Sequence, residues 1–240
     1  RGQNPSVAIA RFSYVGETIQ MYIKFKIMTN KYYSLLGKIL SEGKIQNKKK
    51  GKIKYLLNEQ LSLTPVDLLD IFEGHNIARK KLKNELLLFM QGERSVEKYR
   101  ELGISWWDYC GSILVNSYPT YFEKLPPLIS KINREKRNSK NYVLFLGETG
   151  MESNQSPCLS LVQFQIDDGR LVVSAYQRSS DANLGLPADI YHLYLMARQI
   201  DLPLKSITLN LGNVHIYENN QRNTELLLSG KENVKFDLNV

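Results

Sequence analysis

The sequence predicts an α/β fold in which a mixed, twisted sheet packs against helices. Apolar residues alternate with strand period at 161–166 and 171–177, while residues 78–91 place theirs with helical spacing. With 240 residues and 42% hydrophobic content, the chain is long enough to bury a sizeable core. No internal repeat or linker divides it.

The first half of the chain predicts strands followed mainly by helices. These are strands at 7–15 and 18–27, a helix at 29–43, a strand at 54–63, a helix start at 64–67, and an amphipathic helix at 78–91. The second half alternates between the two types. It predicts a helix at 125–135, a strand at 142–146, a hairpin of strands 161–166 and 171–177, a helix at 190–199, a strand at 206–211, a helix or turn at 221–228, and a last strand at 233–240.

The charge balance favours anionic partners. The chain carries 32 basic and 24 acidic residues, a formal net charge of +8. Much of the excess lies in a lysine-rich run at 44–54, which is typical of a solvated turn. The run lacks the interleaved aromatic residues of a nucleic-acid reader, so we expect no nucleic-acid partner.

Cysteine and histidine usage indicates neither a metal site nor a disulfide framework. Cys110 and Cys158 are the only cysteines, and the three histidines are scattered. No apolar run reaches the length of a membrane span, and no signal pattern opens the chain. We therefore expect a cytoplasmic protein without metal or membrane contact.

Cys158 is a candidate nucleophile because it follows a proline at the junction of a loop and a strand. A cysteine attacks as the thiolate, so it requires a neighbouring cation or donor that lowers its pKa. The hairpin turn at 167–169 is predicted to bring Arg178 back towards Cys158. The alternative is that Cys158 is a small core residue.

Five spaced motifs in the second half of the chain occur in a fixed order. They are Pro157-Cys158, Gln163-Phe164, Tyr-Gln-Arg-Ser-Ser-Asp at 176–181, Leu-Gly-Leu-Pro at 184–187, and Leu-Gly-Asn-Val-His-Ile-Tyr at 211–217. Their order and spacing resemble the catalytic half of the thymidylate synthases. Two stretches of the first half, Asn-Glu-Leu-Leu-Leu-Phe-Met-Gln-Gly at 84–92 and Trp-Trp-Asp at 106–108, are also similar to that family.

The resemblance implies a thymidylate synthase-like fold that dimerises through a sheet face, with a heteromer as the alternative. It implies a pyrimidine nucleoside monophosphate as substrate and 5,10-methylenetetrahydrofolate as co-substrate. By the same resemblance, Cys158 adds to C6 of the pyrimidine, and Glu85 orders water and moves protons.

The implied binding residues are Arg178 and Ser179 for the phosphate, Asp181 near the base, Gln163 in the nucleotide pocket, His215 and Tyr217 for the sugar hydroxyl, and Trp107 for the folate. Taken alone, Glu85 also fits a helix surface, and Trp106 and Trp107 also fit a core.

Asp189 departs from the thymidylate synthases, which carry an asparagine that pairs with N3–H and O4 of uracil. Cytosine presents an N3 acceptor and a C4 amino donor. A carboxyl group accepts from that amino group and, when protonated, donates to N3. An aspartate here is similar to the cytidylate hydroxymethylases of the same superfamily, which implies hydroxymethylation of dCMP or CMP at C5. The alternative is that Asp189 only caps the following helix.

Other departures keep alternatives open. Lysines at 48–50 replace a phosphate-binding arginine of the family, and Lys140 and Asn141 replace two arginines that reach across its dimer interface. The tyrosine used in proton abstraction is not clearly placed, with Tyr118 and Tyr121 as candidates. The alternative functions are a uridylate methylase or hydroxymethylase, and a non-catalytic nucleotide-binding or partner subunit.

The expected domain organisation is a hairpin appendage or extension at 1–27 and a catalytic domain at 28–240. Thymidylate synthases continue into a tail that closes over the folate and excludes water. We expect the catalytic domain to lack this folate lid, which favours water over hydride as the final reactant.

Overall fold

The computed structural model describes residues 29–48, 51–147, 156–231 and 234–237. The two strands predicted within residues 1–27 lie outside this part of the chain. The strands are β1 (Lys44–Lys48), β2 (Gly51–Leu63), β3 (Val143–Phe145), β4 (Leu159–Asp167), β5 (Arg170–Gln177), β6 (Ser180–Asp181) and β7 (Leu204–Tyr217). The helices are α2 (Lys31–Glu42), α3 (Pro65–Gly74), α4 (Arg79–Met90), α5 (Val96–Glu101), the 3-10 turn η1 (Asp108–Cys110), α6 (Tyr118–Phe122), α7 (Leu125–Glu135), α8 (Gly185–Ala197) and α9 (Glu218–Leu228).

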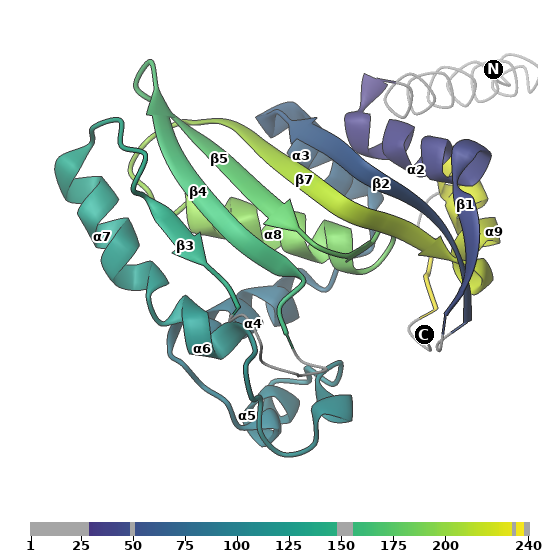
Figure 1. Ribbon diagram of the computed structural model, residues 1–240, viewed down its shortest axis with the longest axis horizontal. Helices are drawn as coiled ribbons and strands as arrows, with labels where there is room; N and C mark the ends of the chain where they lie inside the picture. Colours follow the sequence, from purple (N-terminus) through teal and green to yellow (C-terminus); the bar gives the residue numbers. More distant parts are fainter. Residues whose placement is uncertain (1–28, 49–50, 148–155, 232–233, 238–240) are drawn as a thin grey trace, which may run out of the picture.

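These strands form one mixed sheet in the order β1-β2-β7-β5-β4-β3, with β6 paired to β7 beside this path. The β5–β7 and β6–β7 pairs are parallel, and the other pairs are antiparallel. Figure 1 shows the twisted sheet with α8 behind it, α2 and α9 at the β1 end, and α7 beside β3. The predicted α/β class with a mixed, twisted sheet on helices is confirmed.

The hairpin before Arg178 forms as predicted. Asp167 pairs with Arg170, so Asp168 and Gly169 make a two-residue turn with φ values of 49° and 70°. Positive φ at both central positions is the type I′ geometry, which asparagine, aspartate and glycine favour. The turn returns β5 beside β4, so that Gln177 pairs with Leu159 at the cysteine end.

Strand β7 continues beyond the predicted strand at 206–211. The prediction stops there because the alternation of buried residues changes phase at Gly212. Ile207, Leu209 and Leu211 are buried before this point, and Val214 and Ile216 after it. A Cβ on Gly212 would lie 2.7 Å from the Tyr176 hydroxyl oxygen, closer than real contacts allow. The break in alternation hides the second half of a strand that continues to Tyr217.

Helix starts decide two other predictions. At the start of α3, Thr64 and Asp67 form a capping box, in which the Asp67 amide donates to Thr64 Oγ1 at 3.3 Å and the Thr64 amide to Asp67 Oδ2 at 2.8 Å. Helix α8 begins at Gly185, before the predicted residue 190. Asp189 therefore lies inside the helix, and the alternative that it is the N-cap is wrong.

The last predicted strand, at 233–240, does not form over its described residues 234–237. Instead, Asp237 is tied to α9: its amide donates to Asn220 Oδ1 at 2.8 Å, and its carbonyl accepts from Asn220 Nδ2 at 3.1 Å. The Phe236 ring stacks on His75 with a centroid distance of 5.1 Å. This segment is a wall of the site described below.

One sheet face stays free of helices in the part of the chain that the structure describes. In Figure 1, α3 and α8 lie behind the sheet, and its front is uncovered. Phe145 pairs with Leu161, which pairs with Tyr176, so these apolar residues share one face. Phe145 is 67% exposed and Tyr176 is 43% exposed.

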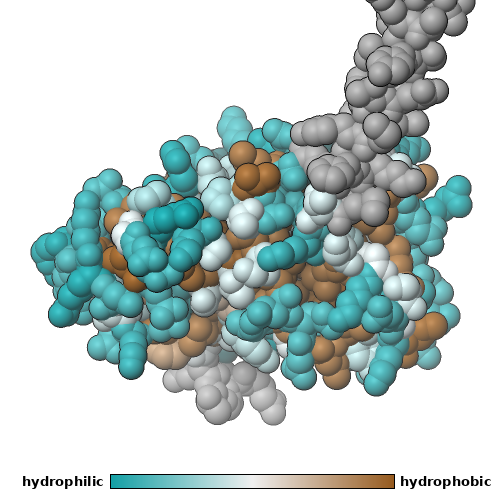
Figure 2. Space-filling view, turned by 90° about the horizontal axis from the view of Figure 1, so that it is seen from above, coloured by the Kyte–Doolittle hydropathy of each residue, from teal (hydrophilic) through white to brown (hydrophobic). Residues whose placement is uncertain are grey.

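Viewed from above, the described surface is mostly hydrophilic, with apolar residues in small groups (Figure 2). No helix among the described residues has the length and apolar character needed to cross a bilayer.

Candidate active site

A cavity of about 590 Å³ opens between α4, α8, the start of β4 and the segment 234–236. It contains most of the residues predicted to perform chemistry, Cys158, Glu85, Asp189 and Trp107, together with Trp106, Tyr118 and His192. Its other walls are mainly apolar or aromatic: Ile77, Ala78, Leu82, Phe89, Phe122, Leu159, Leu184, Val234 and Phe236. A mainly apolar cavity with a few convergent polar groups is the usual form of a small-molecule site.

Glu85 is the central carboxyl group of this cavity. It is 3% exposed, and both indole N–H groups, from Trp106 and Trp107, donate to its Oε1 at 2.5 Å. Burial raises the pKa of Glu85 to about 7, against the two indole hydrogen bonds, which lower it. A carboxyl group that titrates near neutrality is suited to both proton donation and acceptance.

His192 faces the other oxygen of Glu85. Its Nε2 lies 3.4 Å from Glu85 Oε2 and 2.9 Å from the Leu82 carbonyl oxygen. Burial lowers the pKa of His192 to about 4, so the ring is neutral at physiological pH. Glu85 therefore accepts two indole hydrogen bonds at Oε1 and has the His192 ring nitrogen beside Oε2.

Asp189 extends from α8 into the same cavity. Its Oδ2 accepts a hydrogen bond from Gln177 Nε2 at the end of β5. Burial raises the pKa of Asp189 to about 7, and the Gln177 hydrogen bond opposes this shift. Near neutral pH the carboxyl group is thus present in both protonation states, which gives it donor and acceptor capacity.

Cys158 is partly buried at the start of β4, beside Arg178. The Arg178 amide donates to the Cys158 carbonyl at 2.9 Å, and its guanidinium donates to the carbonyls of Pro157 at 3.1 Å and Ser156 at 2.8 Å. Arg178 therefore holds the loop that carries the thiol.

The sequence predicts that Arg178 lowers the pKa of the Cys158 thiol, and the structure does not show this effect. Burial raises the pKa of Cys158, Arg178 opposes this shift, and Asp189 adds to it. The thiol is neutral in this structure because desolvation outweighs one exposed guanidinium.

Of the two candidate tyrosines, only Tyr118 lines the cavity. Its hydroxyl oxygen accepts a hydrogen bond from the Leu159 amide at 3.2 Å, one residue after the thiol. The Tyr121 hydroxyl instead donates to Asn116 Oδ1. Tyr118 is thus the tyrosine placed near Cys158.

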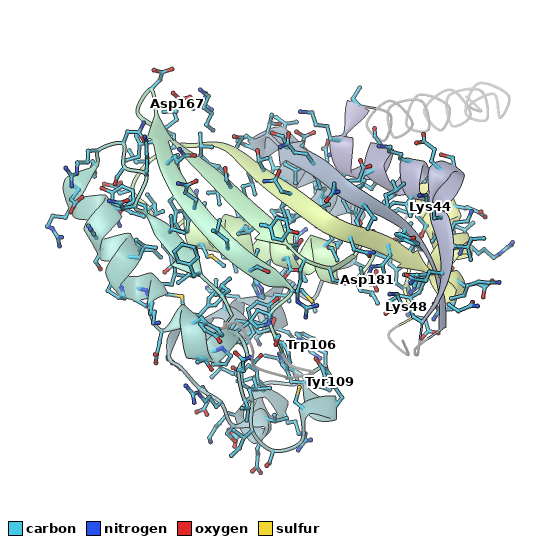
Figure 3. All side chains as sticks on the ribbon, viewed as in Figure 1. Lys44, Lys48, Trp106, Tyr109, Asp167 and Asp181 are labelled. Carbon is cyan, nitrogen blue, oxygen red and sulfur yellow. The ribbon has the colours of Figure 1, made fainter. Side chains whose placement is uncertain are left out.

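The predicted phosphate and sugar residues lie together beside the cavity. Strand β6 follows Arg178 and Ser179 and pairs Asp181 with His215 on β7. The His215 and Tyr217 rings meet edge to face at 5.2 Å. Figure 3 labels Asp181 and Lys48 at the ends of their strands and Trp106 in the segment below the sheet.

Two of these side chains have defined ionisation. Asp181 Oδ1 accepts from the amides of Asn183 at 2.9 Å and Leu184 at 3.3 Å, and burial raises its pKa to about 6. His215 Nδ1 lies 3.0 Å from Asn213 Oδ1, so Nδ1 carries the proton and Nε2 is the acceptor nitrogen. Burial, and secondarily the charge of Lys48, lowers the pKa of His215 to about 4.

Gln163 is not brought into the cavity. It pairs with Val143 and Ser174, and its Nε2 donates to the Lys140 carbonyl at 3.1 Å. Val162 and Phe164, its neighbours along β4, are buried against the helices, so Gln163 points to the opposite face. Within the described ranges, no group of three or more His, Cys, Asp or Glu residues is placed to hold a metal ion.

Sequence reasoning missed two members of the cavity constellation. Gln177 precedes Arg178 in a quoted motif, but only the fold shows that it binds Asp189. His192 belongs to none of the sequence motifs, and the structure places it against Glu85. The signal was its position three residues after Asp189, because positions i and i+3 share a helix face.

The cavity joins a thiol, two carboxyl groups that titrate near neutrality, and an aromatic wall. The sequence model of the family described as thymidylate synthase matches residues 30–240, which include all of these groups. A match over most of the chain establishes kinship, and this family transfers a one-carbon unit from methylenetetrahydrofolate to a pyrimidine nucleotide. The protein therefore belongs to the thymidylate synthase family and is a one-carbon transferase that acts on nucleotides.

Proposed function

We propose that this enzyme is a pyrimidine nucleotide C5 hydroxymethyltransferase that acts on cytidylate, dCMP or CMP. The observation that carries the proposal is the carboxyl group of Asp189 in the cavity, with its pKa raised to about 7. One carboxyl oxygen accepts from the cytosine amino group while the protonated carboxyl donates to N3. Uracil offers N3–H and O4 in the reverse pattern, which leaves buried polar groups unpaired at a cost of about 1 to 3 kcal/mol each.

The residues of this chain divide the proposed work between them. Cys158 adds to C6 of the pyrimidine, which makes C5 nucleophilic, and Asp189 holds the base. Glu85 moves protons at its raised pKa. Arg178 and Ser179 bind the phosphate, Asp181 lies near the base, and His215 and Tyr217 hold the sugar hydroxyl. Gln163 has no place in this division, because it faces away from the cavity.

The cavity also fits the aromatic co-substrate that supplies the carbon unit. Trp107, Phe89 and Phe236 present aromatic side chains on its walls. Planar heterocycles pack favourably against such rings. Trp107 is the residue we propose to contact the folate. Its ring lines the cavity, and its indole N–H donates to Glu85, which holds the ring beside the carboxyl group proposed to move protons.

We also propose that the uncovered sheet face forms a homodimer. It carries the exposed apolar side chains of Phe145 and Tyr176 on the same face as Leu161. Exposed apolar patches of this kind often mark protein interfaces.

The test is release of tritium from C5-labelled dCMP, CMP, dUMP and UMP, with and without methylenetetrahydrofolate. We expect release from a cytidylate, followed by a 5-hydroxymethyl product. Release from uridylate alone would support a uridylate methylase or hydroxymethylase instead. Nucleotide-stabilised melting without any release would support a non-catalytic binding subunit.

A further inference from the structure

His192 is a buried polar side chain that the proposed reaction does not yet use. It is 6% exposed and lines the cavity on α8, one helical turn after Asp189. Its ring meets Phe89 edge to face at 6.0 Å, which fixes the ring plane from the α4 side. Its contact with Leu82 joins α8 to a residue 110 positions earlier in the chain.

The hydrogen bonds of His192 define which nitrogen carries the proton. A carbonyl oxygen can only accept, so the nitrogen 2.9 Å from Leu82 O, Nε2, must carry the hydrogen. The ring is neutral, which leaves Nδ1 with a lone pair. Nδ1 has no hydrogen-bond partner among the described residues. His192 therefore presents an acceptor to the cavity next to Glu85.

The two acceptors lie close enough to share one small ligand. Nε2 is 3.4 Å from Glu85 Oε2, and Nδ1 belongs to the same five-membered ring. Nδ1 and Oε2 are therefore within the span of two hydrogen bonds, about 5.8 Å. A water molecule between them would donate one O–H to each acceptor.

Resting on the proposed hydroxymethylation, we propose that His192 Nδ1 and Glu85 hold the water that attacks the methylene carbon on C5 of the pyrimidine. The water oxygen forms a bond to this carbon, and the π pair of the exocyclic double bond moves into the ring. One water proton passes to the Glu85 carboxylate, while the other O–H stays hydrogen-bonded to His192. The ring pair then restores the C5–C6 double bond and expels the Cys158 sulfur as thiolate.

A purely structural role for His192 makes a different prediction. If the ring only ties α8 to the Leu82 carbonyl, its loss weakens every step that needs the cavity. If it holds the attacking water, its loss affects only events after C5 has lost its proton. Tritium release precedes water addition. Measuring both tritium release and hydroxymethyl product therefore separates a structural role of His192 from a role in holding the water.

The experiment compares H192F, which removes both ring nitrogens, with H192Q, whose amide supplies one donor and one acceptor. Y191F is the matched control, because Tyr191 is the neighbour on α8 that packs against Phe72 outside the cavity. In H192F we expect tritium release from labelled cytidylate within about 3-fold of wild type, and hydroxymethyl product per tritium released lowered about 10-fold. H192Q should recover most of the product, and Y191F should match wild type.

A second readout needs no substrate. Trp106 and Trp107 are the only tryptophans, and both donate to Glu85, so their fluorescence reports its ionisation. In H192F an apolar ring replaces the polar ring whose Nε2 lies 3.4 Å from Glu85 Oε2, so stronger desolvation should raise the pKa of Glu85 and move the fluorescence midpoint to higher pH. An unchanged midpoint would contradict the contact on which the inference rests.

The failure of this inference is distinguishable from failure of the proposed function. A wild-type enzyme that releases no tritium from cytidylate overturns both. A wild-type enzyme that does, together with an H192F variant that loses both signals equally or keeps its product ratio, overturns only the role of His192. A melting temperature for each variant identifies loss of fold as a cause.

Discussion

Glu85 and Asp189 are two carboxyl groups of one cavity whose pKa values burial raises to about 7. Burial disfavours the charged form, and in each case a donor from another element, Trp106 and Trp107 or Gln177, opposes the shift. Groups that titrate near the working pH are those that exchange protons most effectively. Desolvation of these two carboxyl groups therefore gives the site its ability to exchange protons near neutral pH.

A first prediction concerns stability and Glu85. Its folded pKa of about 7 exceeds the ordinary value of 4.5, so its contribution to stability is full below pH 4.5 and is lost as the pH rises through 7. Glu85→Gln cannot ionise. The unfolding free energy of wild type relative to E85Q should fall by an amount on the order of 3 kcal/mol between pH 4.5 and pH 8. Urea denaturation at several pH values measures this difference, and parallel curves would contradict the raised pKa.

A second prediction concerns base recognition by Asp189. Asp189→Asn replaces the group that pairs with cytosine by an amide that pairs with N3–H and O4 of uracil. The ratio of kcat/KM for cytidylate to that for uridylate should fall about 10- to 100-fold. Competition between the two labelled nucleotides gives this ratio directly. An unchanged preference would remove Asp189 from base recognition.

At the scale of elements, one short segment closes the cavity. Residues 234–236 line it. The next residue, Asp237, is held by two hydrogen bonds between its backbone and the side chain of Asn220 on α9. Phe236 stacks on His75, whose Nε2 lies 2.7 Å from the Tyr32 hydroxyl on α2. Two helices far from the reacting atoms thus position the aromatic wall for the co-substrate.

A third prediction tests this arrangement. Asn220 is fully buried and its side chain makes both hydrogen bonds to the backbone of Asp237, so Asn220→Ala removes both bonds and should cost about 1 to 3 kcal/mol of stability. It should also weaken tetrahydrofolate binding, measured by quenching of Trp106 and Trp107. Asn219→Ala is the matched control, because among the described residues the Asn219 side chain makes only an exposed hydrogen bond, from Nδ2 to Asp237 Oδ2 at 3.2 Å. Equal effects of the two substitutions would exclude a positioning role for Asn220.

Elements with local signals were predictable from sequence, and those defined by distant contacts were not. Helix α7 has the predicted bounds, because a proline lies in its first turn and the left-handed Lys136, with φ of 44°, follows it. Strand β7 was predicted only as far as Leu211, because Gly212 breaks its alternation. Sequence motifs identified Glu85 and Cys158 as site residues. The place of His192 could not be predicted in this way, because it depends on the packing of α8 on α4.

At the scale of the whole molecule, the sheet has one face covered by helices and one open. The open face shows Phe145 and Tyr176, and the chain carries a formal net charge of +8. A positive field attracts nucleotides and polyanionic co-substrates from solution. The proposed dimer would cover the apolar part of the open face without covering the cavity on the other side of the sheet.

A fourth prediction follows for assembly. Phe145→Glu places a charge in the proposed interface. In sedimentation analysis the wild type should be a dimer and this variant a monomer. Val66→Glu is the control, since Val66 is equally exposed, at 68%, on helix α3 away from that face. A monomeric wild-type protein would contradict the proposed dimer.

The most direct test of the central claim is to trap the covalent step at Cys158. A 5-fluorinated cytidylate cannot lose a proton from C5, so attack by the thiol in the presence of methylenetetrahydrofolate should leave a stable adduct. Mass spectrometry of the digested enzyme should find the nucleotide on the peptide that contains Cys158, and Cys158→Ser should show no adduct while still binding cytidylate. An adduct on Cys110, or formation only with the fluorinated uridylate, would contradict the account.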